Sequence, residues 1–231
     1  MWIPERWLSN DCIAAALGRP PRRAEIQLLR DRRLDHVLVR AHPAFPALLY
    51  LPIALGSVLY ASLRGVTWGA LALTFAAGWL VFSLAEYLIH RCLFHHPVGT
   101  TREARLDAFL THGYHHTYQN DATRLVMPPL VSVPIAVVTS TLLLALFGRY
   151  GAAAFAGVLV GYVLYDSLHW AAHHVRAKRG PLAWLRRYHL LHHNDSRAAR
   201  YGVSSPLWDL LLGTYLSPYL KPELRVGRQA P

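Results

Sequence analysis

Acidic side chains are scarce in this sequence. Its 231 residues include 13 aspartates and glutamates against 24 lysines and arginines, which gives a formal net charge of +11, and only 16% of the residues are charged while 53% are hydrophobic. Such an apolar composition excludes a disordered chain. A basic protein of this kind meets either nucleic acid or an anionic membrane surface. Because the basic residues alternate with long apolar blocks, we predict a membrane partner and no nucleic acid.

Cysteine is also scarce, since Cys12 and Cys92 are the only two. Two isolated cysteines do not make a disulfide framework, and we expect both to be free thiols. The first residues, 1–6, lack the order of a basic stretch followed by an apolar one that is typical of a signal peptide, so we expect none.

Long apolar runs, by contrast, are abundant. They comprise residues 44–63, 66–89, 127–147 and 151–165. The first carries no charge and has about twenty residues, the length that crosses a hydrocarbon core, and the second contains Glu86 as its only charge, near its end. Residues 64–65 join the first two runs and residues 148–150 join the last two. The sequence therefore predicts an all-α integral membrane protein with four transmembrane helices in two tight hairpins.

The positions of lysine and arginine predict the orientation of these helices. Of the 24 such residues, only Arg64 and Arg149 lie in the hairpin connections, and all others lie in the N-terminal segment, the central loop and the C-terminal segment. The positive-inside rule places these three segments and both termini on the cytoplasmic side. Every histidine lies in these segments or at the adjoining helix ends, so all of them can meet in one cytosolic helical cap.

The N-terminal segment, residues 1–43, is rich in arginine and carries apolar positions such as Ile26 and Leu29. We predict short amphipathic helices that lie at the membrane interface, with a solvated basic tail as the alternative. We separate this segment from residues 44–231, which we predict to form one membrane-embedded domain.

Histidine is the anomaly of the composition, with 14 residues. Twelve of them form four clusters, which are His90, His95 and His96; His112, His115 and His116; His169, His173 and His174; and His189, His192 and His193. Residues at i, i+3 and i+4 share one face of a helix, so the second and fourth clusters can each converge on one point. Isolated His36 and His42 receive no metal role.

The number of convergent imidazoles predicts two metal ions. Imidazole nitrogen suits iron, zinc, copper and nickel. His96 and His174 each follow another histidine directly, and adjacent helical residues point in different directions. His90 and His95 are five residues apart, so the helix must end or unwind for both to point inward. Ten imidazoles remain, too many for one ion and about right for two.

Three segments carry a resemblance to a known family. They are HGYHHTYQNDATRLVMPP at residues 112–129, YDSLHWAAHH at 165–174, and YHLLHH at 188–193 followed by YGVSSPLWD at 201–209. Residues 82–215 resemble the fatty acid hydroxylase superfamily, and within it the fatty acid 2-hydroxylases that act on sphingolipid acyl chains. The match is specific because the positions between the histidines agree as well. Gln119 departs from the pattern, since the family often has proline there.

The resemblance implies a dinuclear centre, generally of iron, although zinc can occupy isolated protein, and a reaction with dioxygen. The ligands that it implies are His90, His95, His112, His115, His116, His169, His173, His189, His192 and His193. Many members carry a fused cytochrome b5 domain with an HPGG haem motif, which this sequence lacks. We therefore expect a separate electron donor, a cytochrome b5, ferredoxin or reductase.

The predicted function is oxygen-dependent hydroxylation of a lipid acyl chain, most specifically at its 2-position, on a free, CoA-linked or sphingolipid-linked fatty acid. The catalytic residues that we assign are His112, His115, His116 and Asp121. Asp121, Asp166 and Glu86 are candidate acceptors for ring N–H groups, with helix capping or pairing with arginine as the alternative.

Three arginines could meet a lipid phosphate or carboxylate, with ordinary positive-inside charge as the alternative. They are Arg124, Arg186 and Arg187. Two other functions remain open. One is hydroxylation or desaturation of a sterol, a carotenoid or an aminolipid at the same type of centre. The other is metal transport, which the few polar residues within the apolar runs disfavour.

Overall fold

The structure, a computed structural model, describes residues 3–195 and 197–221. It contains helices and no strand within those residues, apart from one isolated bridge between Leu8 and Leu29. Four helices are long and apolar enough to cross a membrane. They are α3 (Phe45–Leu63), α4 (Trp68–Leu88), α7 (Pro129–Phe147) and α8 (Arg149–His174). The predictions of an all-helical protein and of four helices of membrane-spanning length are confirmed.

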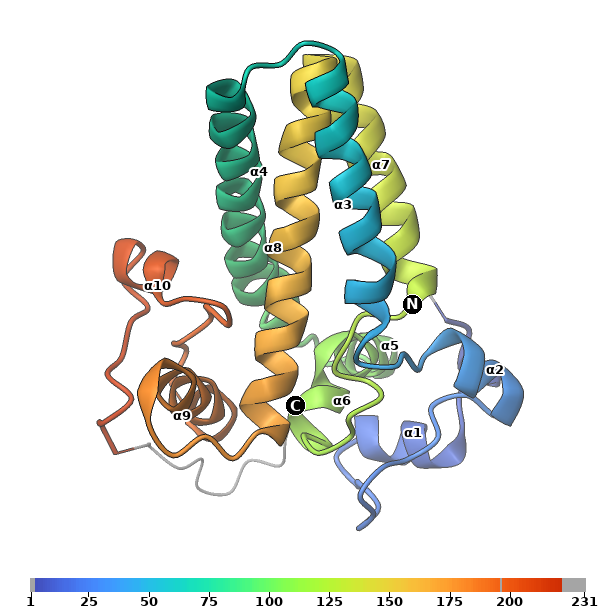
Figure 1. Cartoon of the computed structure of the whole chain (residues 1–231). Helices are drawn as coiled ribbons and strands as arrows, with labels where there is room; N and C mark the ends of the chain where they lie inside the picture. Colours follow the sequence, from blue (N-terminus) through green and yellow to red (C-terminus); the bar gives the residue numbers. More distant parts are fainter. Residues whose placement is uncertain (1–2, 196, 222–231) are drawn as a thin grey trace.

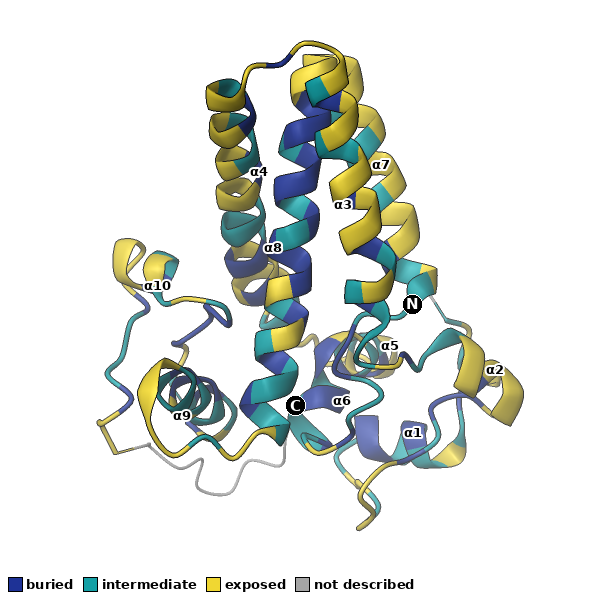
Figure 2. Ribbon diagram, viewed as in Figure 1, coloured by how far each residue is buried: buried dark blue, intermediate teal, exposed yellow. Residues whose placement is uncertain are grey.

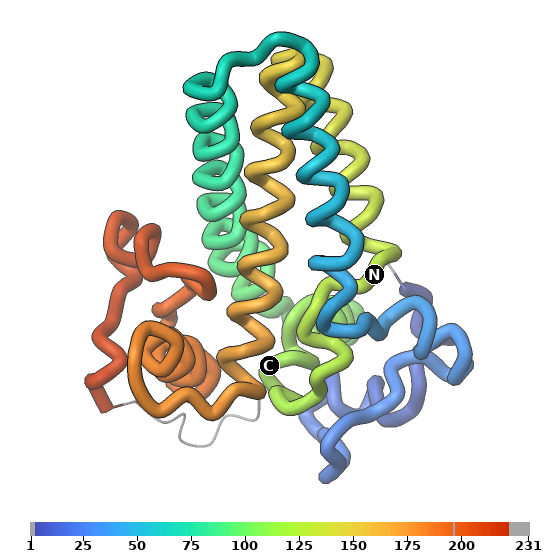
Figure 3. The backbone as a smooth tube through the Cα atoms, viewed as in Figure 1, coloured from blue at the N-terminus to red at the C-terminus, as the bar shows by residue number. Residues whose placement is uncertain are grey.

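Helix α8 is the centre of the bundle. In Figures 1 and 3 it runs between α4 on one side and α3 and α7 on the other. Within the most apolar 18 residues of each helix, 61% are buried inside the protein in α8, against 22% in α3, 11% in α4 and 6% in α7. Figure 2 accordingly shows α8 mostly buried and the other three exposed on their outer sides. The outer helices therefore present apolar side chains to their surroundings, as helices in a lipid bilayer do.

The fourth apolar run was expected to cover residues 151–165, or to continue through residues 166–167, and α8 extends further, to His174. Asp166 and His169 are part of this helix and are buried inside the protein. Burial against neighbouring helices allows polar residues to continue the same helix beyond the apolar run.

Glycine allows α4 and α8 to approach closely. A Cβ atom added at Gly157 of α8 would lie 2.0 Å from the Phe75 carbonyl oxygen, and one added at Gly78 of α4 would lie 1.9 Å from the Ala154 carbonyl oxygen. Small residues at such contacts bring two helix backbones together where no hydrophobic effect drives association. A side chain larger than hydrogen is therefore excluded at Gly78 and Gly157.

We expect Gly157→Ala to lower the free energy of unfolding by about 1–3 kcal/mol, the usual effect of overpacking, because the added methyl group meets the backbone of α4. Thermal unfolding in detergent measures the effect. Gly56→Ala in α3 is the matched control, since nothing lies within 4 Å of its added Cβ. Equal unfolding temperatures for the two variants would contradict the close approach.

The other helices gather at one end of the bundle. They include α1 (Asn10–Ala16), α2 (Arg32–Leu38), α5 (Arg102–Ala108), α6 (Tyr114–Thr117), α9 (Gly180–Asn194) and α10 (Leu207–Leu211), and a 3₁₀ turn, η1 (Glu5–Trp7). In Figure 1 they lie around the lower ends of the long helices, with α9 and α10 on one side of α8 and α1, α2 and α5 on the other. We call this lower part the cap.

The N-terminal segment is part of the cap. Leu8, Cys12 and Ile26 are buried in one apolar cluster with Leu106 and Phe109 from the central loop. Helix α1 is capped by Ser9, whose side chain accepts a hydrogen bond from the Cys12 N–H. Burial raises the pKa of the Cys12 thiol to about 12, and Cys12 and Cys92 are both free.

Several apolar residues that we assigned to a membrane-facing surface of this segment thus pack inside the protein, Ile26 and Leu29 among them. Val37, on α2, remains exposed. Contact of this segment with the membrane stays a prediction.

Candidate metal centre

The first group of ring nitrogens lies between three elements of the cap and the end of α4. One nitrogen from each of five histidines lies within 4.8 Å of the others, and the five are His90, His95, His112, His116 and His192. The Nε2 atoms of His90 and His112 are 3.1 Å apart, and those of His192 and His95 are 3.0 Å apart. Imidazole nitrogens from distant parts of the chain thus face one another.

The second group has the same construction around the lower end of α8. Its five histidines also lie within 4.8 Å of one another by one nitrogen each, and they are His115, His169, His173, His189 and His193. The Nε2 atoms of His169 and His115 are 2.9 Å apart, as are those of His173 and His189. The structure thus divides the ten histidines singled out in the sequence into two groups of five, each of which could hold a metal ion.

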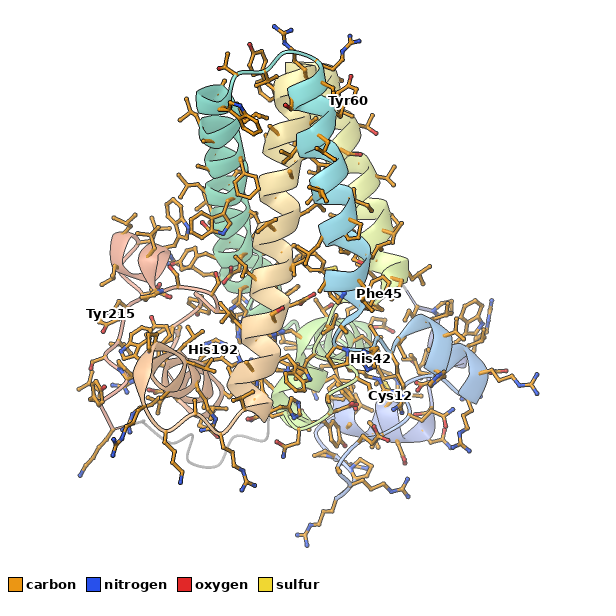
Figure 4. All side chains as sticks on the ribbon, viewed as in Figure 1. Cys12, His42, Phe45, Tyr60, His192 and Tyr215 are labelled. Atoms are coloured by element: carbon orange, nitrogen blue, oxygen red, sulfur yellow. The ribbon has the colours of Figure 1, made fainter. Side chains whose placement is uncertain are left out.

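The two groups are neighbours. The rings of His116 and His193, one from each group, stack with centroids 4.2 Å apart. The segment 109–117 and helix α9 contribute ligand candidates to both groups, whereas the stretch that follows α4, residues 89–95, contributes only to the first and α8 only to the second. Figure 4 labels His192 where α9 lies beside the lower end of α8. The two sites are therefore adjacent, and the segment 109–117 and helix α9 line both of them.

Two stretches of π-helix bring the first group together. They are η2 (Ile89–Phe94), which continues α4, and η3 (Phe109–Gly113), which continues α5. In a π-helix the hydrogen bonds join residues five apart, and the His95 N–H indeed donates to the His90 carbonyl oxygen at 3.2 Å. His90 and His95 therefore point to the same side, as their spacing required of an unwound helix. Single π-helical turns of this kind are common at functional sites.

Backbone carbonyl groups hold two of the rings. The His90 Nδ1–H donates to the Tyr201 carbonyl oxygen at 2.6 Å, and the His192 Nδ1–H donates to that of Ala199 at 2.9 Å. These bonds leave Nε2 of both rings as the free acceptor, directed at the group. The loop that carries the two carbonyls is fixed by Arg200, which is fully buried with φ 63° and donates to Asp195 at 2.8 Å.

We did not predict this loop as part of the site. A carbonyl group belongs to every residue, so no side-chain signal in the sequence marks Ala199 and Tyr201 as the partners of the histidines. The signal that the sequence did offer is the YGVSSPLWD segment at residues 201–209, which begins in this loop and carries part of the resemblance.

Burial controls the charge of the rings outside the membrane-length helices. It holds their pKa well below 6.5, and the neighbouring imidazoles lower it further for His112, His115, His189, His192 and His193. These rings are neutral at neutral pH and keep a lone pair for a metal ion. Four Nδ1 atoms of the second group are buried without a hydrogen-bond partner among the described residues, those of His115, His169, His189 and His193. Ten imidazoles facing one another in two groups suit two ions such as iron or zinc.

Asp121 is bonded to α6, the helix that carries His115 and His116, through Tyr114. Its carboxylate accepts hydrogen bonds from the Tyr114 hydroxyl at 2.6 Å and from Arg124 Nη1 at 2.9 Å, and is not among the groups that converge on either centre. Burial raises the pKa of Asp121, but the hydrogen bonds from Tyr114 and Thr123 and the charge of Arg124 outweigh it, so the net pKa is lowered. Asp121 is therefore an ionised group that fixes the helix.

Neither of the other two carboxylates forms a hydrogen bond with a histidine ring among the described residues. Glu86 accepts from the backbone N–H groups of Val203 and Ser204, both at 2.8 Å. Asp166 is buried one turn before His169, and no hydrogen bond joins it to a ring among the described residues. Asp121 thus pairs with an arginine, as the alternative predicted, and Glu86 bonds backbone N–H groups of a loop, which neither reading predicted.

The remaining histidines stay outside both groups. His96 is exposed and bonds its own neighbour, the Pro97 carbonyl, at 3.0 Å, and His174 stacks on Trp170. His36 and His42 lie in the N-terminal segment and in the connection that precedes α3. Gln119, the departure from the expected motif, donates to the His116 carbonyl oxygen at 3.2 Å and so ties the loop to the helix.

These features define a multi-pass membrane protein with a pair of histidine sites at one end of its bundle. The sequence profile of the family described as "Fatty acid hydroxylase" matches residues 75–214. The chain belongs to the fatty acid hydroxylase family, which confirms the resemblance seen in the motifs.

Individual relatives agree. The chain is 35% identical over 167 residues to dihydroceramide fatty acyl 2-hydroxylase FAH2 of Arabidopsis thaliana, which covers 72% of this chain and 70% of that protein. It is 42% identical over 148 residues to ceramide very long chain fatty acid hydroxylase SCS7 of Saccharomyces cerevisiae, covering 62% of this chain and 38% of that one. It is 38% identical over 154 residues to human fatty acid 2-hydroxylase, with coverages of 65% and 41%. The matched region thus spans less than half of the yeast and human proteins.

A solved structure has the same fold. The structure titled "Full length scs7p (only hydroxylase domain visible)" matches with a TM-score of 0.78 and 31% identity, over 95% of this chain and 84% of that one. The likeness therefore includes the cap as well as the long helices.

Proposed function

We propose that this chain hydroxylates a lipid acyl chain at carbon 2, with dioxygen as the oxidant. The observation that carries the proposal is the pair of five-nitrogen groups at the end of a membrane-length bundle in a member of the fatty acid hydroxylase family. The balanced reaction takes one dioxygen, two electrons and two protons, replaces one C–H bond by C–OH and releases one water. The named relatives are hydroxylases of fatty acyl chains.

We propose that each group of five histidines holds one iron ion. The ions, when bound, supply the redox chemistry that activates dioxygen. Burial keeps the imidazoles of His112, His115, His189, His192 and His193 neutral. Backbone carbonyl groups hold His90 and His192 in the tautomer that presents Nε2 to the centre. All ten histidines serve as metal ligands in this proposal.

Within the set, His112, His115 and His116 have a special place, because one short helical segment supplies the first and second groups together. Asp121 acts on the same segment through Tyr114. We propose that these four residues form the catalytic part of the site, with Asp121 as the group that keeps the segment in position.

The substrate proposed is the amide-linked acyl chain of a sphingolipid, because the yeast and Arabidopsis relatives are named for ceramide and dihydroceramide. A free or CoA-linked fatty acid is the second possibility for the carrier. A sterol, carotenoid or aminolipid would react at the same centre, and the names of the relatives favour the acyl chain over these. Metal transport has less support, because both histidine groups lie at one end of the bundle and do not line a path across it.

We further propose that α3 with α4 and α7 with α8 cross the bilayer as two hairpins, and that the cap and both termini are cytosolic. The scarcity of basic residues at the far end of the bundle supports this orientation. The chain ends themselves, residues 1–2 and 222–231, lie outside the described residues. We keep residues 1–43 as an N-terminal segment at the interface and residues 44–231 as the membrane-embedded domain.

A separate electron donor is proposed, a cytochrome b5, ferredoxin or reductase. A groove of about 520 Å³ along α9 is lined by Lys178, Arg179, Arg186 and Arg187, and within the described part of the chain none of them forms an ion pair. Helix α9 also carries His189 and His193. An acidic donor that docks in this groove is separated from the metal centre by little more than one helix.

We expect the double variant Lys178→Glu/Arg179→Glu to raise the KM for a soluble cytochrome b5 domain several-fold, since charge reversal weakens attraction of an acidic partner. The rate of product formation at increasing donor concentration measures it. Arg32→Glu/Arg33→Glu on α2 makes the same charge change on the opposite side of the cap and is expected to leave the KM unchanged. Equal KM values for both double variants would exclude the groove as the docking site.

The function is tested by mass spectrometry of lipids from cells with and without the chain, grown under ¹⁸O-labelled dioxygen. We expect 2-hydroxy acyl chains that carry one labelled oxygen, only where the chain is expressed. A labelled sterol, carotenoid or head group with unlabelled acyl chains would assign the activity to the alternative substrates. No labelled lipid in cells that accumulate metal with the protein would favour transport.

A further inference from the structure

Helix α10 presents an apolar surface to the outside of the protein. Leu207, Leu210, Leu211 and Leu212 are 41%, 58%, 64% and 44% exposed. In Figure 2 the outer side of α10 is coloured as exposed, and in Figure 1 the helix stands beside the lower part of α4, apart from the rest of the cap. Four exposed leucines within six residues form an apolar surface of the kind that binds an apolar partner.

The opposite side of α10 is fixed to the protein. Asp209 is fully buried and accepts hydrogen bonds from the N–H groups of Tyr201 and Gly202 at 2.9 and 2.7 Å. The Thr214 hydroxyl donates to the same carboxylate at 2.7 Å. The helix cannot turn its leucines inward without breaking these bonds, so their outward direction is a feature of the folded cap.

The position of α10 along α4 indicates that lipid covers the exposed leucines. Trp208 Nε1 donates to the Ser83 hydroxyl of α4 at 3.0 Å. Ser83 precedes Leu88, the last residue of α4, by about one and a half turns, which is roughly 7 Å along the axis. If α4 crosses the hydrocarbon core, this bond lies inside the core, within the depth of about 5–10 Å that interfacial helices reach. On α4 itself Leu80, Val81 and Leu88 are 48%, 63% and 42% exposed at the same level.

We propose that α10 lies in the bilayer, with its leucines among the acyl chains of the leaflet that adjoins the cap. This surface continues the lipid-facing side of α4 and belongs to neither metal group. One consequence follows for the site. The carboxylate of Asp209 holds the backbone of Tyr201, whose carbonyl oxygen holds the His90 ring. Helix α10 therefore both contacts the membrane in this proposal and, through Asp209 and Tyr201, orients the ring of His90.

The test uses an environment-sensitive fluorophore on single cysteines of the full chain in phospholipid vesicles. Cys92→Ser removes the exposed native cysteine, and Cys12 is buried. Labels are placed at Leu211→Cys and, in case that variant folds poorly, at Leu210→Cys. Leu73→Cys, 72% exposed on α4, is the control within the bilayer, and Lys178→Cys on the cap is the control in water.

We expect the label at position 211 to show blue-shifted emission and quenching by lipids spin-labelled near the head group. The label at position 73, which lies on the bilayer-crossing helix α4, is expected to show blue-shifted emission and quenching by spin-labelled lipids as well. Emission and quenching equal to those at position 178 would overturn the proposal. Absence of quenching together with cross-linking between two chains through Leu211→Cys would also overturn it, since the surface would then join two copies. Neither result depends on hydroxylase activity or metal content.

Discussion

His193→Ala is expected to abolish the hydroxylated product and to reduce the bound metal from two ions per chain to about one. His193 belongs to the second group, and its ring also stacks on His116 of the first. Loss of a partner that merely supports a ligand typically costs 10–100-fold in metal affinity or activity, so removal of a ligand itself is expected to cost more. Metal analysis of purified protein and lipid mass spectrometry measure the two effects.

His96→Ala is the matched control for this experiment. It removes a histidine adjacent to a proposed ligand, but His96 is exposed and outside both groups. Its product and metal content are expected to equal those of the parent chain. If His193→Ala loses metal and still makes product, the oxygenase proposal fails. If it retains both ions, the assignment of His193 as a ligand fails while the function stands.

Arg124→Met is expected to lower the free energy of unfolding by about 3–5 kcal/mol, the usual effect of breaking a buried ion pair from one side. The Arg124 side chain is 3% exposed and pairs with Asp35 at 2.6 Å and with Asp121 at 2.9 Å. Without it Asp121 retains no ion pair with another described residue, whereas Asp35 keeps Arg40 at 3.2 Å. Denaturant unfolding in detergent measures the change.

The same substitution is expected to reduce metal content, because Arg124 connects the N-terminal segment to the helix of the second cluster. Its Nη1 donates to the Ile26 carbonyl oxygen and to the Tyr114 hydroxyl, both at 2.9 Å. Arg105→Met, an exposed change in the same loop, is the control and is expected to alter stability by less than about 0.5 kcal/mol. The double variant Arg124→Met/Asp121→Asn is expected to recover part of the stability, since it removes the carboxylate left alone. No recovery would contradict the charge explanation.

Arg124 also corrects a sequence-based hypothesis. Its guanidinium was a candidate for binding a lipid phosphate or carboxylate, but it is buried between two carboxylates of the protein. Arg187 likewise donates to the Pro218 carbonyl oxygen at 2.6 Å and lies over the Tyr219 ring. The pattern in the sequence could not reveal these partners, because Asp35 is 89 positions away from Arg124.

The sequence by itself determined the helical class, the four membrane-length helices and the family. Hydrophobic runs and residue spacing are local properties of the sequence, so they can be read without knowing how the rest of the chain folds. The spacing of His112, His115 and His116 on one helical turn likewise singled out a convergent set, and the five-residue step from His90 to His95 indicated an unwound helix where η2 is found. The histidines are so numerous and so regularly placed that chance could not explain them.

Only the tertiary structure decided how these parts combine. It placed α8 at the centre, divided the histidines into two groups that share α9, and buried part of the N-terminal segment beneath the central loop. It also assigned the hydrogen bonds of His90 and His192 to the carbonyl groups of Tyr201 and Ala199. Each of these features depends on contacts between residues far apart in the chain or on backbone atoms that all residues possess. The pattern of side chains along the sequence therefore does not predict these features.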